Sequence, residues 1–404
     1  MTLAEILDRR KSVADQLTSP PPETFHTTVE RLSKESSLKL EEVMSPELRI
    51  GGVTAHWGQK YEREKIDQIV REIFGNVDEL KGDTGFGEIY RVPEGYSYEK
   101  AAEEEMRVIK RLVERTLELN NWRQDQVKAL YFAGSPVKTN RFGFDYGAAI
   151  AQASGLTHLL KDERIYNYFL ACNSAGCALK DILIKEEGKV LLIAVEGLTK
   201  QAGGLREEST DPLSARIFSD AAAAIGVEPN KTLTHLLGEH MEVEDENGAL
   251  AATPAWQEIV DLQGPLIQKK GNILLIRLPE PPERYKLWMR GEETTRLFLR
   301  IARDLMEIVY QQFKEEYPGE EIKMIIAHHP SRGVNLLIGR RFENIGVEAP
   351  MPWVINDGNS SGATSLVAFV RLLNEFNPGD RFLFASFGAG ASADFWVGEF
   401  GKTG

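Results

Sequence analysis

The chain has 404 residues, enough for two or three domains, and its hydrophobic fraction of 42% is ordinary for a globular protein. Its net charge of −13 argues against a general nucleic-acid binder and against binding to an anionic membrane surface. We find no signal-peptide pattern and no stretch that could span a bilayer, and the two cysteines form neither a CxxC motif nor a metal framework. We therefore expect a cytoplasmic protein without a metal.

The sequence divides into four regions. Residues 1–47 are polar and helix-prone, are interrupted by three consecutive prolines, and are interpreted as an N-terminal helical extension. Residues 48–229 form a first half, and residues 230–290, with an acidic and a proline-rich stretch, form a connecting or cap region. Residues 291–404 form a second half.

The order helix, strand, strand, helix, strand occurs once in each half, which indicates an internal duplication. The strands are short and apolar, as expected of buried strands that are covered on both faces. The third and fourth elements meet at an elbow, and the helices that follow the elbows begin with small, uncharged residues, so we expect them to lie between two sheets. The predicted fold is α/β, a five-layer αβαβα sandwich built from two duplicated halves. Its expected elements are a helix at 98–120 with strands at 127–133 and 188–195, and a helix at 293–314 with strands at 322–327 and 379–386.

The first elbow carries Cys172, where an apolar run ends and a helical pattern begins. Its Asn173-Ser-Ala-Gly matches Asn359-Ser-Ser-Gly in the second elbow, which follows the expected strand that starts at Trp353. A cysteine at a helix N-terminus has its thiolate favoured by the helix dipole, and it is then a good nucleophile. The alternative is a buried structural cysteine, which is common and which suits Cys177 much better.

Two histidines, His328 and His329, follow the strand at 322–327 directly. The carboxyl ends of such strands are where α/β sheets place ligands and catalytic groups. Adjacent side chains point apart, so at most one imidazole can face Cys172, as a general base or as a donor to an oxyanion. Neighbouring positions do not converge on one metal ion without further ligands.

Asn359 can donate a hydrogen bond to a carbonyl or enolate oxygen without a change of charge, or it can simply cap the helix that follows. The glycine-rich turn Gly388-Ala389-Gly390 ends the last core strand, where its backbone N–H groups can complete an oxyanion hole. We expect the backbone N–H groups of Cys172 and Ala389 to form that hole. The sequence has no complete dinucleotide-binding GxGxxG motif after a strand.

Taken in order, these motifs resemble the thiolase superfamily, and most closely its ketoacyl-acyl-carrier-protein synthase III branch. The resemblance extends from about residue 48 to residue 400. It rests on the Ala-Cys172 elbow, Phe218-Ser-Asp220-Ala, Met289-Arg-Gly-Glu, His328-His-Pro-Ser-Arg, Gly358-Asn359-Ser-Ser and the terminal Phe387-Gly-Ala-Gly.

This resemblance implies a Cys-His-Asn centre, in which Cys172 takes an acyl group from a thioester. His328 and Asn359 then bind the thioester oxygen of a second substrate and stabilise its enolate during a Claisen condensation. His328 is preferred because the family's catalytic histidine begins a His-Gln-x-(Asn/Ser) run, although His329-Pro330 imitates the His-Pro of plant-type polyketide synthases. The resemblance also implies a homodimer, acyl-coenzyme A or acyl-carrier-protein thioesters as substrates, and no tightly bound cofactor.

The sequence departs from the family pattern before Thr84-Gly-Phe86, where the tryptophan and arginine that grip coenzyme A are missing. This difference favours carrier-protein substrates, and it places a specialised enzyme, for example one of secondary metabolism, on an equal footing with a fatty-acid initiator. Acyl carrier proteins are acidic, so we expect a basic docking patch, for which Arg332, Arg340 and Arg341 are the candidates. Their alternative role is that of solvated helix residues.

Two other functions remain open. One is an acyltransferase that passes the acyl group to an oxygen or nitrogen nucleophile. The other is a non-catalytic partner subunit of a related synthase. An intact Cys172, His328 and Asn359 argues against the second of these.

Overall fold

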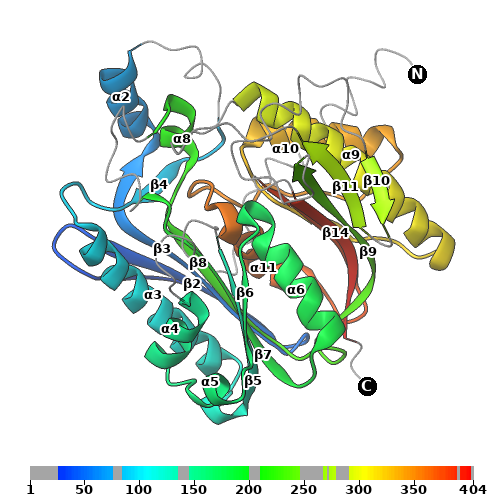
Figure 1. The fold of residues 1–404 in the computed structure, drawn as a ribbon, viewed down its shortest axis with the longest axis horizontal. Coiled ribbons are helices and arrows are strands. Elements are labelled where there is room, and N and C mark those ends of the chain that lie inside the picture. Colours follow the sequence, from blue (N-terminus) through cyan, green and yellow to red (C-terminus); the bar gives the residue numbers. More distant parts are fainter. Residues whose placement is uncertain are drawn as a thin grey trace.

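The computed structural model describes residues 26–75, 84–134, 145–199, 210–245, 267–270, 273–278, 291–388 and 392–401. Two sheets with helices between and outside them make up this part of the chain (Figure 1). No helix in the described residues is long and apolar enough to cross a membrane.

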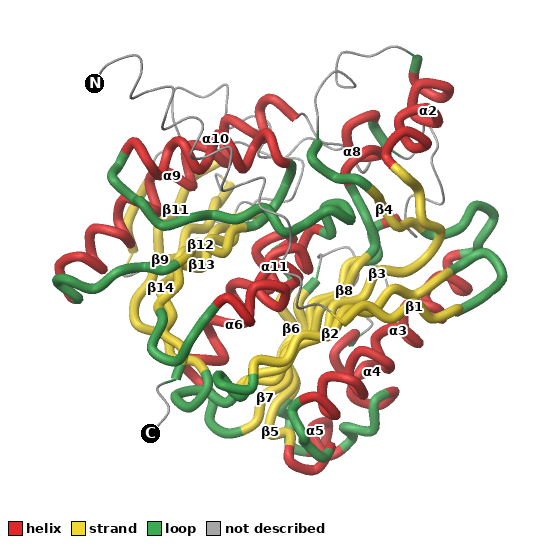
Figure 2. Tube along the Cα trace, turned by 180° about the vertical axis from the view of Figure 1, so that it is seen from behind, coloured by secondary structure: helices red, strands yellow, loops and turns green. Residues whose placement is uncertain are grey.

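The first sheet has eight strands in the order β1-β2-β3-β8-β7-β5-β6, and β4 pairs with β3 off this path. The central strands β5, β7 and β8 are almost entirely buried, which agrees with their continuous apolar sequences. Helices α3, α4 and α5 cover the outer face of this sheet (Figure 2). The strands are β1 (His26–Arg31), β2 (Ser37–Ser45), β3 (Ile50–Glu62), β4 (Glu88–Arg91), β5 (Val127–Ala133), β6 (Ile165–Tyr168), β7 (Lys189–Glu196) and β8 (Ala221–Val227), and the helices are α3 (Tyr98–Leu119), α4 (Tyr146–Ala153) and α5 (His158–Lys161).

The second sheet has six strands in the order β10-β11-β9-β14-β13-β12. Helices α9 and α10 lie on its outer side (Figure 2). Two further short helices, α2 and α8, lie beside β4 at one end of the molecule (Figure 1). The elements are β9 (Leu233–Asp245), β10 (Ile267–Lys270), β11 (Ile273–Leu278), β12 (Met324–Ala327), β13 (Arg381–Gly388), β14 (Ser392–Phe400), α2 (Arg63–Phe74), α8 (Pro212–Ile217), α9 (Gly291–Glu316) and α10 (Arg332–Asn344).

Helices α6 (Ser174–Lys185) and α11 (Thr364–Leu372) lie between the two sheets (Figure 1). Every residue of α11 is buried, and its mostly apolar sequence lacks the polar face of a surface helix. Gly176 in α6 allows close packing, because a Cβ atom there would collide with Ser386 of β13. The five-layer α/β sandwich is therefore confirmed.

The N-terminal region differs from its prediction. Residues 26–45 form β1 and β2, an antiparallel pair that extends the first sheet next to β3, so the helical prediction is wrong for these residues. In β2 the side chains of Leu38 and Leu40 are buried and those of Ser37 and Lys39 are less so, the alternation typical of a strand. Residues 1–25 lie outside the described part of the chain.

Two further predictions need correction. The region 230–290 is not only a connection, because β9 is a core strand that pairs with β14 and β11 in the second sheet. The segment 353–356, predicted as a strand before the second elbow, runs without a strand ladder. The strand predicted before the first elbow exists as β6, which pairs in parallel with β5.

Candidate active site

The first elbow places Cys172 at the head of the central helix α6. Ala171 has a φ of 49°, which a non-glycine residue rarely adopts, and a short 3₁₀ turn η4 (Ala171–Asn173) leads directly into α6. The elbow is held by Ser174, whose Oγ accepts a hydrogen bond of 2.8 Å from the N–H of Leu170 and donates one of 2.7 Å to the carbonyl of Gly134. Cys172 is 6% exposed, and its Sγ lies 3.3 Å from the Oγ of Ser361 in the second elbow.

The second elbow has nearly the same backbone. Ser361 has a φ of 43° in the short turn η6 (Ser361–Ala363), and the N–H of Ser360 donates a hydrogen bond of 2.8 Å to the Oγ1 of Thr364. This matches Ser361 to Ala171 and makes Gly362 the counterpart of Cys172. The sequence match of Asn359 to Asn173 is therefore wrong by four residues, because Asn359 precedes the second turn.

Asn359 is buried and its side-chain amide has a defined orientation. Its Oδ1 accepts hydrogen bonds from the N–H of Ser361 at 2.8 Å and from the Oγ1 of Thr364 at 3.0 Å. These two donors assign the oxygen, so the NH₂ group points to the other side, where it lies 3.4 Å from the carbonyl of Pro330. Asn359 and Cys172 thus share Ser361 as a neighbour, and the NH₂ group is directed towards the loop that carries His328.

His328 follows β12 and is completely buried. The backbone N–H of His328 donates a hydrogen bond of 2.9 Å to the carbonyl of Ala385. The imidazole ring packs edge to face against the ring of Phe387, with the ring centroids 5.5 Å apart. Neither ring nitrogen has a hydrogen-bond partner among the described residues. Burial, with a smaller contribution from His329, lowers the pKa of His328 to about 3, so the imidazole is neutral at pH 7. A neutral imidazole with both nitrogens available can donate a hydrogen bond to a ligand oxygen.

His329 is held by the protein itself. Its Nδ1 lies 2.7 Å from the carbonyl of Ala327 and its Nε2 lies 3.1 Å from the carbonyl of Pro352. Burial lowers the pKa of His329 to about 4 in spite of these two carbonyls. The neutral ring has one N–H, which donates to one of these carbonyls, and both nitrogens face the protein backbone, which makes His328 the better candidate for contact with a substrate.

The end of β13 lies against the backbone of the first elbow. A Cβ atom at Gly388 would lie 2.6 Å from the backbone nitrogen of Cys172, and Ser386 Oγ donates a hydrogen bond of 3.3 Å to the Cys172 carbonyl. Because Phe387 contacts His328, the thiol and the imidazole lie at the same end of this strand. Ala389, the second residue predicted for the oxyanion hole, lies outside the described residues.

Sequence reasoning missed two buried polar residues at this centre. Ser361 contacts the thiol, and Glu196 at the end of β7 accepts a hydrogen bond of 3.3 Å from the N–H of Gly362. Glu196 could have been identified from the sequence, because it is a charged residue that directly follows the apolar run of a core strand. Ser361 could not, because the elbows were matched four residues out of register.

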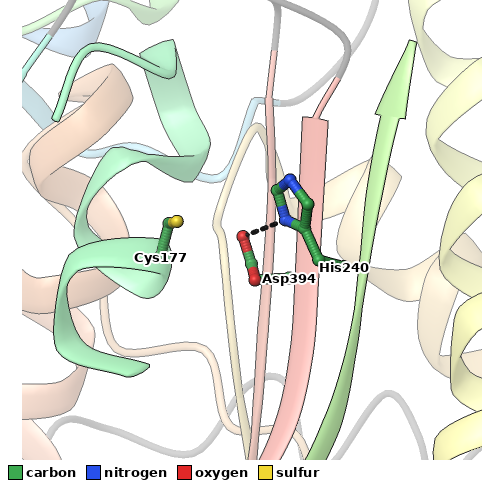
Figure 3. A group of neighbouring side chains, drawn as sticks. All are labelled: Cys177, His240 and Asp394. Atoms are coloured by element: carbon green, nitrogen blue, oxygen red, sulfur yellow. Dashed lines mark hydrogen bonds and ion pairs between the residues drawn. The ribbon is translucent and has the colours of Figure 1, made fainter. Parts of the chain in front are cut away.

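Behind the first elbow, Cys177, His240 and Asp394 place one possible metal-ligand atom each within 4.8 Å of one another (Figure 3). The carboxylate of Asp394 is already engaged, because it pairs with the Lys180 ammonium and accepts hydrogen bonds from Asn173 at 2.8 Å and from His240 at 2.7 Å. Burial opposes its ionisation, but Lys180 and His240 hold the pKa of Asp394 well below its usual value. A cation here would have to displace a buried ammonium, so this donor set fits a metal poorly.

The candidate docking arginines lie at two ends of α10. Arg332 is half-buried at the start of α10, and its backbone N–H donates a hydrogen bond of 2.8 Å to the carbonyl of Thr84. Arg340 and Arg341 are exposed in its last two turns. The three side chains therefore do not form one contiguous cluster along the helix, since seven residues of helix lie between Arg332 and Arg340.

Searches of the sequence against protein-family models and against curated proteins found no match. Solved structures do resemble the chain. Germicidin synthase from Streptomyces coelicolor, a type III polyketide synthase, has a TM-score of 0.58 at 14% identity, over 86% of this chain and 98% of that chain. OleA from Xanthomonas campestris has a TM-score of 0.56 at 14% identity, over 89% of this chain and 96% of that chain.

A third similar structure is 3-oxoacyl-(acyl carrier protein) synthase III from Xanthomonas oryzae pv. oryzae. It has a TM-score of 0.56 at 13% identity and covers 89% of this chain and 97% of that chain. Each comparison covers 86–89% of this chain and 96–98% of the other chain. The chain therefore has the thiolase-type fold that its sequence motifs predicted.

Proposed function

We propose that this protein is a thioester condensing enzyme that forms a carbon–carbon bond through an acyl-Cys172 intermediate. The observation that carries the proposal is the meeting of three groups around the ends of β12 and β13. These are the Cys172 thiol at a helix N-terminus, a neutral His328 without a protein partner among the described residues, and an Asn359 amide with an assigned orientation. The proposal is also supported by the similar structures, which include polyketide synthases and an acyl-carrier-protein synthase.

In the first half-reaction the Cys172 thiolate attacks the carbonyl of an acyl thioester. The C–S bond to the carrier breaks, the carrier leaves as a thiol after taking a proton, and the acyl group remains on Cys172. Backbone N–H groups near Gly388 and Cys172 stabilise the oxyanion of the tetrahedral intermediate.

In the second half-reaction a malonyl-type thioester loses carbon dioxide and forms an enolate. His328 and Asn359 donate hydrogen bonds to the enolate oxygen, a role that suits two neutral donors because neither needs to change its charge. The enolate carbon then attacks the acyl-Cys172 carbonyl, the new C–C bond forms, and the Cys172 thiolate leaves.

The donors are proposed to be acyl-coenzyme A or acyl-carrier-protein thioesters, with carrier docking at Arg332, Arg340 and Arg341 and with a homodimer as the active form. The separation of Arg332 from Arg340 and Arg341 along α10 requires a carrier that contacts both ends of the helix. Reversal of Arg340 and Arg341 to glutamate should raise KM for carrier-bound substrates and leave KM for coenzyme A substrates unchanged. A structure of an OleA variant with bound lauric acid and lauroyl-CoA makes long acyl chains a sensible part of the donor panel.

The proposal is tested by intact-protein mass spectrometry after incubation with a panel of acyl-coenzyme A and acyl-carrier thioesters. We expect one acyl mass on the wild type, none on Cys172→Ala, and an undiminished adduct on the control variant Cys177→Ala. Addition of malonyl thioester should then release a β-keto product that retains malonyl carbon. Acylation followed by ester or amide formation would instead identify an acyltransferase, and an inert homomer that co-purifies with a related chain would identify a partner subunit.

A further inference from the structure

The segment 353–358, which leads to Asn359, forms no strand ladder, and Asn359 itself makes only an isolated bridge to Phe218. The counterpart of this segment before the first elbow is β6, whose backbone pairs with β5 over four residue positions. A segment that carries a functional side chain needs some other fixation, since a displacement of about 1 Å at such a group can cost about a hundredfold in rate. Buried side chains contribute this fixation.

Arg371 of α11 supplies a large part of this fixation. Its guanidinium donates to both carboxylate oxygens of Asp357 at 2.7 and 2.8 Å and to the carbonyl of Val354 at 3.0 Å. Arg371 is 3% exposed and Asp357 is 2% exposed, so this forked pair is shielded from water. One arginine thus binds the segment at two points before Asn359.

Strand β2 provides the remaining charges. Glu41 accepts a hydrogen bond of 2.6 Å from the Nε of Arg371, and Lys39 lies 3.0 Å from both Glu41 and Asp357. The four residues Lys39, Glu41, Asp357 and Arg371, called here the β2 clamp, contain two cations and two anions. Lys39 also lies 3.3 Å from Glu88, whereas Arg371, Asp357 and Glu41 are buried, so removal of one of these three leaves a buried charge with less compensation.

The path from the β2 clamp to Asn359 is short. Gly358 lies between Asp357 and Asn359 with a φ of 89°, and a Cβ atom there would lie 2.5 Å from the Cβ of Ser219. The N–H of Asn359 then donates a hydrogen bond of 2.7 Å to the carbonyl of Ile217. A shift of Asp357 is therefore transmitted to Asn359 through a tight turn that has little freedom to absorb it.

We propose that the β2 clamp positions Asn359, and that β2 thereby controls the condensation step. Residues 37–45 precede the sequence motifs, which begin at about residue 48, and the contacts of Lys39 and Glu41 connect this strand to the segment before Asn359. Glu41 and Lys39 are positioning residues that act through Arg371 and Asp357. The inference rests on the proposed function, because it assigns Asn359 to the second half-reaction.

The test is Glu41→Gln, with Glu42→Gln as the matched control on the same strand. Glu42 points away from the clamp and pairs with Arg115 of α3 at 2.6 Å. The rate of acyl-Cys172 formation and the rate of product release after addition of malonyl thioester are measured separately in both variants and in the wild type. In Glu41→Gln we expect acylation to stay within about twofold and condensation to fall between about ten- and a hundredfold, whereas Glu42→Gln should leave both rates unchanged.

Lys39→Met provides a second variant in case Glu41→Gln folds poorly, and it should show the same split between the two half-reactions. Equal losses in both half-reactions, or unchanged condensation in a folded Glu41→Gln, would overturn the inference and leave the proposed function intact. A wild type that never forms an acyl-Cys172 adduct would instead remove the proposed function. The thermal unfolding midpoint of each variant shows whether it is folded.

Discussion

The two elbows share one backbone and differ in how the chain enters them. Ala171 and Ser361 both have a positive φ, and the hydroxyls of Ser174 and Thr364 accept hydrogen bonds of equal length, 2.8 Å, from Leu170 and Ser360. The first elbow is entered from β6, whereas the second is entered from a segment without a ladder. Pairing with a neighbouring strand therefore holds the approach to the thiol, whereas isolated backbone hydrogen bonds together with buried charged side chains hold the approach to the amide.

This difference makes the two functional groups sensitive to different kinds of substitution. The position of Cys172 depends on the sheet and on the contacts of α6, including the bond from Asn173 to Asp394. The position of Asn359 depends on its backbone hydrogen bonds with Ile217 and Ser219 and also on a few charged side chains, each of which a single substitution can remove. The following predictions separate the two elbows, beginning with the largest expected effect.

Asp394→Ala should weaken the anchorage of the first elbow. The substitution leaves the half-buried Lys180 ammonium and the buried Asn173 amide without their partner, so we expect a loss of about 3–5 kcal/mol in the free energy of unfolding. Chemical denaturation measures this loss. Asp304→Ala is the control, because Asp304 pairs with its exposed neighbour Arg303 and should change stability by less than about 1 kcal/mol.

Gly362→Ala tests how closely the elbows approach each other. A Cβ atom at Gly362 would lie 2.7 Å from the carbonyl oxygen of Ala171, so the new methyl group must push the first elbow away. We expect a destabilisation of about 1–3 kcal/mol, measured by denaturation, together with slower acylation of Cys172. The same substitution at Gly333 in α10, which has open space around its Cβ position, should not destabilise the protein.

The ends of β5 and β12 differ in whether they carry titratable groups. β5 is followed by Gly134, which has no titratable side chain, whereas β12 is followed by His328 and His329. Burial depresses the pKa of His328 to about 3 and that of His329 to about 4, while both side chains take up protons near pH 6.5 in the unfolded chain. Their stabilising contribution is therefore complete above pH 6.5 and is lost as the pH falls towards 4. For each histidine, the free energy of unfolding should fall by about 1.4 kcal/mol for every pH unit that the pH is lowered in this range.

His328→Gln should accordingly reduce the slope of the unfolding free energy against pH between pH 4.5 and 6. The slope is measured by denaturation at several pH values. An unchanged slope would show that His328 is not buried in its neutral form.

Ser174→Ala and Thr364→Ala compare the two elbow hydroxyls, and each should destabilise the protein by about 0.5–1.5 kcal/mol. Thr364 also donates a hydrogen bond of 3.0 Å to the Oδ1 of Asn359, and Ser174 has no corresponding bond to that amide. Only Thr364→Ala should therefore slow condensation after acylation is complete. Similar effects of both variants on condensation would remove the distinction between the elbows.

Much of the fold could be predicted because its signals are local. The strands at 127–133 and 188–195 and the helix at 98–120 were found as β5, β7 and α3, since apolar runs and helical periodicity identify buried strands and amphipathic helices. The place of Cys172 at a strand-to-helix elbow was visible for the same reason.

The remaining features depend on contacts that no local pattern records. The segment at 353–356 reads as a strand because it is apolar, but Arg371 and Asp357 hold it in place of a ladder. The residue-by-residue match of the two elbows was wrong because the similar sequences Asn-Ser-small-Gly occupy positions that are not structurally equivalent. The short N-terminal strands were missed because polar composition outweighed the alternation that β2 shows in the structure.

The recurrence of an unfavourable backbone angle at Ser361 has a consequence for how such sites are recognised. Backbone strain is often taken as a mark of chemistry, yet of the two elbows that share it here, one is followed by a glycine where the other has a thiol, and four non-glycine residues outside the elbows also have a positive φ. Packing two helix heads against each other demands the bend whether or not a reaction takes place there. In a doubled protein of this kind, conformational strain does not identify the reactive bend, and only the side chain that follows it does.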